Sequence, residues 1–161
     1  SLTRGALETA LIKVEKLKLR DEDPVIFADC DIEWRCPGYF QIIDSLHRIN
    51  QKDFVAILYN PIDTKDSKWL YLVGAEKGYL RNYYDIREKD SSRGGYPAIG
   101  VYYFSSVGFF KNIAKKIMNN YIENKELYLS TALEAVLLND SPLFTIPVDS
   151  FKSLGVPSDL E

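Results

Sequence analysis

The chain has 161 residues, 46% of them hydrophobic, which is enough for one domain with a sizeable core. A formal net charge of -3 gives no bulk attraction for polyanions, so nucleic acid is not an expected partner. The two cysteines, Cys30 and Cys36, are too few to frame a small secreted fold, and no apolar run approaches the roughly 20 residues of a membrane span. We therefore expect a cytoplasmic protein with no membrane partner.

The first part of the chain alternates helices and strands. Apolar residues recur at three or four positions between Gly5 and Leu19, which predicts a helix. A short apolar run at 25–28 predicts a strand buried on both faces, and a second helix after Pro37 precedes a strand at 54–59. Because a parallel return requires a crossover, this alternation predicts parallel strands with helices on both faces of the sheet.

The pattern changes in the second part of the chain. Strand-like runs at 69–73 and 79–84 flank the turn-prone Glu76-Lys77-Gly78, which predicts an antiparallel hairpin. The other expected elements are a strand, two helices and a last strand, at 99–104, 109–117, 129–136 and 143–148. We thus predict a single α/β domain over residues 1–161, a three-layer sandwich with a mixed, mainly parallel sheet.

Two carboxylates, Asp29 and Asp31, come directly after the strand at 25–28. Ligands of α/β sheets bind at the carboxyl ends of strands, and two carboxylates one residue apart can hold a single hard cation such as Mg²⁺. The alternative is that both side chains only cap the turn before Trp34. Spacing by itself leaves both interpretations open.

Other polar groups give weaker signals. His47 is the single histidine, and we expect it on a helix surface, so no zinc cluster or histidine-based triad is predicted. The tyrosines of the predicted strands resemble a stacking platform, but at strand spacing half of them face the core. Core packing is therefore their expected role.

The runs at 3–10 and 25–31 resemble two motifs of the sugar-phosphate nucleotidyltransferases, a family that joins a nucleoside triphosphate to a sugar phosphate and releases pyrophosphate. The run at 3–10 is similar to the family's glycine-led helix start, which implies that Gly5 and Ala6 bind the nucleotide. The run Val25-Ile26-Phe27-Ala28-Asp29-Cys30-Asp31 resembles the strand that ends in the magnesium-binding aspartate. The resemblance implies Asp31 as the main, catalytic Mg²⁺ ligand, with Asp29 as its partner.

Later motifs follow in the family's order. Arg87-Glu88-Lys89 resembles the pair in which the glutamate binds sugar hydroxyls and the lysine binds the sugar's phosphate, so Glu88 and a catalytic Lys89 are implied as sugar-phosphate ligands. The run at 98–104 is similar to the glycine-containing strand beneath the sugar, which adds Gly100 to the site. The closing run at 153–160 resembles the family's last turn.

The chain also departs from the family in two places. Ser153 stands where many members have a second metal-binding aspartate. The family begins with a strand and a glycine-rich Arg/Lys loop that grips the triphosphate, and the 161 residues contain no such segment. We therefore expect an N-terminally truncated domain, the later part only, whose open sheet edge is covered by a missing segment or by a homo-oligomer partner.

The resemblance implies nucleotidyl transfer in a full-length parent, with a nucleoside triphosphate and a sugar phosphate as substrates and Mg²⁺ as cofactor. One alternative is a catalytically inactive nucleotide-sugar-binding or regulatory module, favoured by Ser153 and the absent loop. Another alternative is a nucleotide-sugar glycosyltransferase, an enzyme class that also binds its metal ion through an Asp-x-Asp motif.

Overall fold

The computed structural model describes residues 3–50, 52–62, 68–92, 94–120 and 126–155, without the side chain of Glu88. Within these ranges the helices are α1 (Ala6–Lys16), α2 (Tyr39–Ile49), α3 (Val107–Asn119) and α4 (Leu129–Leu138), with short 3-10 turns η1 (Ala75–Lys77) and η2 (Tyr83–Asp85). The strands are β1 (Val25–Ala28), β2 (Ile32–Arg35), β3 (Val55–Tyr59), β4 (Leu70–Leu72), β5 (Tyr79–Leu80), β6 (Ile86–Glu88), β7 (Tyr96–Phe104), β8 (Leu143–Pro147) and β9 (Ser150–Ser153). No described helix is long and apolar enough to cross a bilayer.

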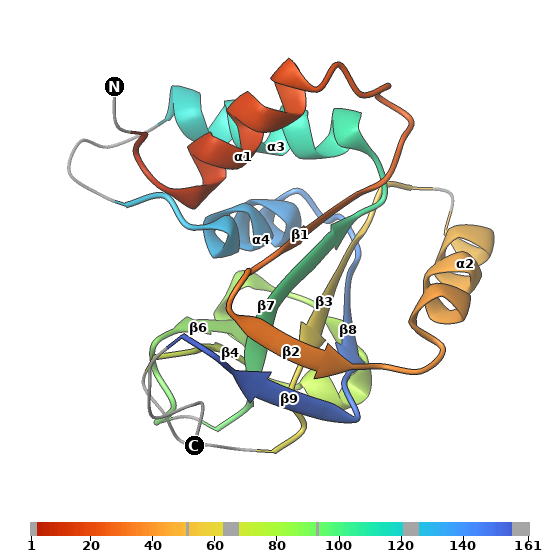
Figure 1. Cartoon of the computed structure of the whole chain (residues 1–161), viewed down its shortest axis with the longest axis vertical. Coiled ribbons are helices and arrows are strands. Elements are labelled where there is room, and N and C mark those ends of the chain that lie inside the picture. Colours follow the sequence, from red (N-terminus) through yellow and green to blue (C-terminus); the bar gives the residue numbers. More distant parts are fainter. Residues whose placement is uncertain (1–2, 51, 63–67, 93, 121–125, 156–161) are drawn as a thin grey trace.

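The long strand β7 organises the main sheet (Figure 1). It pairs with β3 on one side, and with β1 and then β4 on the other, antiparallel in each case. The β4–β6 and β5–β8 pairs are also antiparallel, which leaves β3–β8 as the parallel pair among the described strands. The prediction of a mainly parallel sheet is therefore wrong: β1 and β3 run in the same direction, but β7 lies between them in the opposite one.

Helices cover both faces of this sheet. α1, α3 and α4 pack on one face, where their apolar residues join those of β3 and β7 in the larger core cluster. α2 lies on the other face and places Tyr39, Ile43 and Leu46 in a second cluster. The two expected helix layers are thus present around a mixed sheet.

Two local predictions fail because strand partners differ from those expected. β1 pairs with β7 alone among the described strands, so its residues alternate between half-buried and exposed, and Ile26 is 44% exposed. The runs at 69–73 and 79–84 do not form one hairpin, since β4 pairs with β6 and β7 whereas β5 pairs with β8. β5 lies at one edge of the sheet, whereas β4 lies between β7 and β6 near the other edge, so the two strands are far apart in the sheet although they are close in the sequence.

A separate two-stranded arm lies beside the carboxyl end of β1. β2 follows Asp31 directly and pairs antiparallel with β9, in a register that sets Ile32 opposite Ser153. The Leu154 amide donates a hydrogen bond of 2.8 Å to the Asp31 carbonyl and so extends this pairing by one step. The arm brings residues more than 120 positions apart in the sequence to the edge where the sheet ends.

Candidate functional site

A cleft lies at the carboxyl end of β1, bounded by the ends of β4 and β6 and by the first residues of α1 and α4. Its first cavity, of about 310 Å³, is lined by residues that include Ala6, Asp29, Lys68, Lys89, Gly100 and Tyr128. Its second cavity, of about 260 Å³, adds Asp31, Ser153 and Gly155 from the arm. The two cavities share Asp29, Lys68 and Trp69, so they are adjoining parts of one site.

Asp29 stands between the two cavities. Its amide donates a hydrogen bond of 3.0 Å to the Gly100 carbonyl, and its carboxyl lies so close to Gly100 that any side chain there would overlap it. Although the residue as a whole is exposed, the partial burial of this carboxyl raises its pKa, and the neighbouring Asp31 carboxylate raises it further. A cation placed between the two carboxylates would offset both effects.

Asp31 faces the arm. A Cβ atom added to Gly155 would lie 2.6 Å from Oδ2 of Asp31 and 3.9 Å from Oγ of Ser153, so the three residues meet in the second cavity. The structure thus places Ser153 where a third carboxylate would join Asp29 and Asp31. No group of three or more His, Cys, Asp or Glu suited to a metal occurs within the described residues. Two carboxylates, a hydroxyl and water fit Mg²⁺, which usually binds through one or two carboxylates and its own waters.

Lys89 enters the first cavity from the end of β6. It adopts a left-handed backbone conformation with φ 52, which is uncommon for a residue other than glycine, and its amide donates a hydrogen bond of 3.0 Å to the Trp69 carbonyl. Its Nζ lies 5.5 Å from the ring centroid of Tyr128. Backbone strain of this kind is concentrated at functional sites. The implied sugar contact of Glu88 concerns a side chain that lies outside the described part of the chain.

The first turn of α1 forms the opposite wall. Ala6 lines the cavity, whereas Gly5 lies just behind it, with a φ of 138 and ψ of -171 that side chains rarely adopt. A Cβ atom on Gly5 would lie 2.5 Å from the Leu127 carbonyl oxygen. Close contact between α1 and the segment before α4 therefore already requires a glycine here, and the nucleobase contact of Gly5 and Ala6 stays a prediction.

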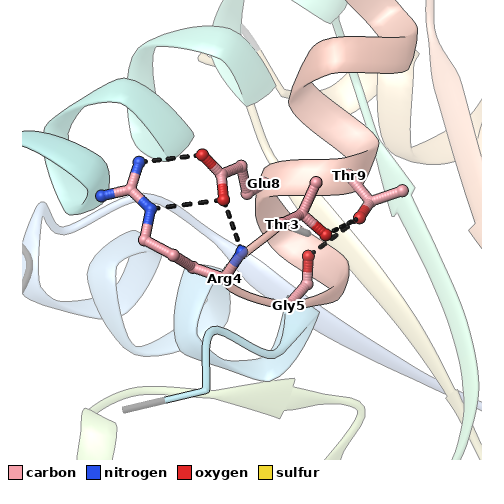
Figure 2. A network of polar contacts seen from close by, with 5 residues as sticks. All are labelled: Thr3, Arg4, Gly5, Glu8 and Thr9. Carbon is pink, nitrogen blue, oxygen red and sulfur yellow. Dashed lines mark hydrogen bonds and ion pairs between the residues drawn. The ribbon is translucent and has the colours of Figure 1, made fainter. Parts of the chain in front are cut away.

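A polar network fixes this end of α1 (Figure 2). Arg4 and Glu8 form an ion pair of 2.9 Å, and Oγ1 of Thr9 donates a hydrogen bond of 3.1 Å to the Gly5 carbonyl. The side-chain hydrogen bonds from Arg4, followed by the bond from the Arg4 amide, lower the pKa of Glu8. Because that pKa is lowered, the ion pair stabilises the fold above the ordinary pKa of a glutamate, and its contribution is lost as pH falls through the lowered value.

The cleft combines several features that suit an anion beside a cation. The N-terminal residues of two helices, Ala6 of α1 and Leu129 and Ser130 of α4, lie at the first cavity, where helix dipoles favour negative charge. Lys68 and Lys89 add two positive charges to the same cavity. The carboxylates of Asp29 and Asp31 lie on the side toward the arm.

The structure brings most of the implied site residues together. Asp29, Asp31, Lys89, Gly100 and Ala6 line the cleft. His47, which we expected on a helix surface, is exposed on α2 and hydrogen-bonded to the hydroxyl of Tyr103, away from the cleft. Partial burial, followed by the charge of Asp44, raises the pKa of Tyr103 to about 12.

Sequence reasoning missed three cleft residues. Lys68, Trp69 and Tyr128 line the first cavity, and none of them is among the site residues expected from the sequence. A signal was present, because Lys68-Trp69 and Glu126-Leu127-Tyr128 each combine a charge with an aromatic ring next to a predicted element. The place of Lys68 and Trp69 in the cleft depends on the β4–β6 pairing, which the sequence pattern did not predict, whereas Tyr128 directly precedes α4.

Comparisons with known proteins support the fold of this cleft-bearing domain. No protein-family profile matches the sequence, and no curated protein does so. Among solved structures, the chain is similar to a nucleoside-diphosphate-sugar pyrophosphorylase from Vibrio cholerae RC9, with a TM-score of 0.66 and 15% sequence identity. The match covers 99% of this chain but 64% of the other, so the chain spans less than two thirds of that protein. At this identity the likeness concerns the fold alone: the chain is an α/β protein with a mixed sheet whose fold resembles that of a nucleoside-diphosphate-sugar pyrophosphorylase.

Proposed function

We propose that this domain takes part in nucleotidyl transfer from a nucleoside triphosphate to a sugar phosphate, giving a nucleotide sugar and pyrophosphate. The observation that carries the proposal is the cleft itself: Asp29 and Asp31 adjoin a cavity that contains Lys89, at the carboxyl end of β1. The fold, which is that of a nucleoside-diphosphate-sugar pyrophosphorylase, supports the same activity. The residues suit substrates that carry phosphate and bind a divalent cation.

In this reaction a phosphate oxygen of the sugar phosphate attacks the α-phosphorus of the nucleotide. A new P–O bond forms as the bond from the α-phosphorus to the bridging oxygen breaks, and the electron pair leaves with pyrophosphate. Lys89 would hold the attacking phosphate and reduce its repulsion from the nucleotide. Asp29 and Asp31 would hold Mg²⁺, which supplies charge stabilisation to the phosphates. The remaining task of the domain is to orient the two substrates.

A second function, binding or regulation without catalysis, is favoured by Ser153. It occupies the second cavity beside the two aspartates and provides no negative charge. A domain with such a site binds a nucleotide sugar but holds its metal weakly, since affinity for hard cations rises with the number of charged ligands. An assay for pyrophosphate release distinguishes the two functions, because nucleotidyl transfer releases pyrophosphate and binding without catalysis does not.

Calorimetric titration tests the proposed site. We expect the protein to bind a hexose 1-phosphate and a nucleoside diphosphate hexose in the presence of Mg²⁺, and Lys89→Met to weaken both by about tenfold or more because one charge-assisted contact is lost. Asp31→Asn should remove the Mg²⁺ dependence of binding. The matched controls, Lys77→Met and Asp44→Asn, alter exposed residues outside the cleft and should bind like the wild type.

The proposal fails if the wild type binds neither ligand at millimolar concentration, or if the cleft variants and the controls bind equally. Where binding is present, an assay for pyrophosphate release from nucleoside triphosphate and hexose 1-phosphate separates the two functions. Turnover supports transfer, whereas binding without turnover supports the regulatory function.

A further inference from the structure

Lys68 occupies the place where the two cavities of the cleft meet. It lines the cavity that contains Lys89, and it also lines the cavity that contains Asp31 and Ser153. Among the described residues, just Asp29 and Trp69 share this position. A ligand that reaches from one cavity into the other must therefore pass Lys68.

The fold delivers Lys68 and Lys89 to the cleft from neighbouring strand ends. Lys68 comes two residues before β4, and Lys89 directly follows β6, the antiparallel partner of β4. The hydrogen bond from the Lys89 amide to the Trp69 carbonyl continues that ladder to the edge of the cleft. The two lysines thus lie at the same end of one pair of strands, and both line the same cavity.

An aromatic contact with the arm positions the Lys68 ammonium. Its Nζ lies 5.0 Å from the centroid of the Trp69 ring, within the range of a cation–π interaction. The Trp69 ring packs edge-on against Phe151 of β9, with centroids 5.3 Å apart and an interplanar angle of 79°. The arm that holds Asp31 and Ser153 therefore also supports the ring beneath Lys68.

The charges of the cleft indicate what Lys68 binds. Lys68 and Lys89 bring two ammonium groups to one cavity, and a phosphate has enough oxygens to accept hydrogen bonds from both. On the other side, Asp29 and Asp31 would repel a phosphate that approached without a cation. Lys68 lines both the cavity that contains Lys89 and the cavity that contains Asp31, where it can neutralise a phosphate next to the aspartates.

We propose that Lys68 is a substrate-binding residue that holds the phosphate of the sugar phosphate jointly with Lys89, and that it makes the cleft select phosphorylated over unphosphorylated sugars. This inference rests on the proposed function. It adds a second phosphate ligand, from β4, to the one that the sequence implied from β6.

Tryptophan fluorescence gives a direct test, because Trp69 lies under Lys68 and the chain has two tryptophans. In a Trp34→Phe background, glucose 1-phosphate should change the emission of Trp69, and free glucose should not. Lys68→Met and Lys68→Gln should raise the dissociation constant for glucose 1-phosphate about tenfold or more, and Lys68→Arg should stay within about threefold of the wild type, since it keeps the charge. Binding by Lys68→Met should also depend less on salt.

The controls separate the possible results. Lys77→Met removes a lysine outside the cleft and should leave the affinity unchanged, and circular dichroism verifies that each variant is folded. If Lys89→Met weakens binding but Lys68→Met and Lys68→Gln bind like the wild type, the role of Lys68 is refuted and the proposed function stands. If the wild type does not bind glucose 1-phosphate or other hexose 1-phosphates, the proposed function fails and the role of Lys68 fails with it.

Discussion

Replacing Gly5 by alanine is expected to lower the free energy of unfolding by about 3 kcal/mol, from backbone strain and overpacking together. The backbone of Gly5 has a φ of 138 and ψ of -171, a region that is essentially restricted to glycine. The added methyl group would lie 2.5 Å from the Leu127 carbonyl oxygen and 2.8 Å from its amide nitrogen. Those backbone atoms hydrogen-bond Leu7 and Arg4, so they cannot move aside without breaking contacts of α1.

Urea denaturation followed by circular dichroism measures this loss, and Gly74→Ala is the matched control. Gly74 also has a positive φ, of 79, but a Cβ atom there would meet nothing within 4 Å. The control should therefore lose about 1 kcal/mol, the cost of the backbone conformation alone. Equal losses in the two variants would show that the contact with Leu127 is not tight, and would leave a nucleotide contact as the better reason for Gly5.

Replacing Ser153 by aspartate is expected to tighten the binding of Mg²⁺ and Mn²⁺ by about tenfold or more, because each added carboxylate raises the affinity of a site for hard cations. An aspartate at position 153 would act on this site because Ser153 shares the second cavity with Asp29 and Asp31. Without metal, a third carboxylate adds repulsion to a pair in which the pKa of Asp29 is already raised. The variant should therefore be less stable than the wild type without metal, and gain more stability from its addition.

Calorimetry with Mn²⁺ and thermal unfolding with and without metal test both parts. Ser150→Asp is the control, because it adds the same charge to an exposed residue at the other end of β9. Similar Mn²⁺ affinities for the wild type, Ser153→Asp and Ser150→Asp would mean that the second cavity is not a metal site. Ser153→Ala should lower the Mn²⁺ affinity by less than Ser153→Asp raises it, since water can replace a neutral hydroxyl ligand.

Sequence patterns predicted the local elements of this protein better than their arrangement. β1 and β3 lie close to their expected positions, because short apolar runs reflect local burial. The prediction that the strands are mainly parallel was wrong. β7 lies between β1 and β3, and this placement depends on contacts between residues distant in the sequence. On α2, apolar residues recur every three positions from Phe40 to Ile49, yet Phe40 and Ile49 themselves are 69% and 72% exposed. Tyr39 is buried together with Ile43 and Leu46 instead. The apolar spacing therefore predicted that a helix forms, but it did not predict which face of the helix is buried.

The candidate site shows the same division. Asp29 and Asp31 follow the end of a predicted strand, and such positions can be recognised from the chain order of strands and polar residues. Lys89 was implied by the resemblance alone, because β6, the strand that it follows, was not predicted. Lys68 carries no such mark, since its place in the cleft results from the pairing of β4 with β6 and from a tryptophan supported by the arm. The contact between Ser153 and the aspartates likewise requires the β2–β9 pairing, which no local pattern predicts.

A crystal structure with Mn²⁺ and a nucleoside diphosphate hexose tests the central claim most directly, because Mn²⁺ replaces Mg²⁺ and is located by its anomalous scattering. We expect an anomalous peak beside Asp29 and Asp31, with phosphate density within hydrogen-bonding distance of Lys89 and the sugar over Gly100. A ligand or metal bound elsewhere, for instance in the cavity of about 450 Å³ between β1 and α2, with the cleft empty, would contradict the account.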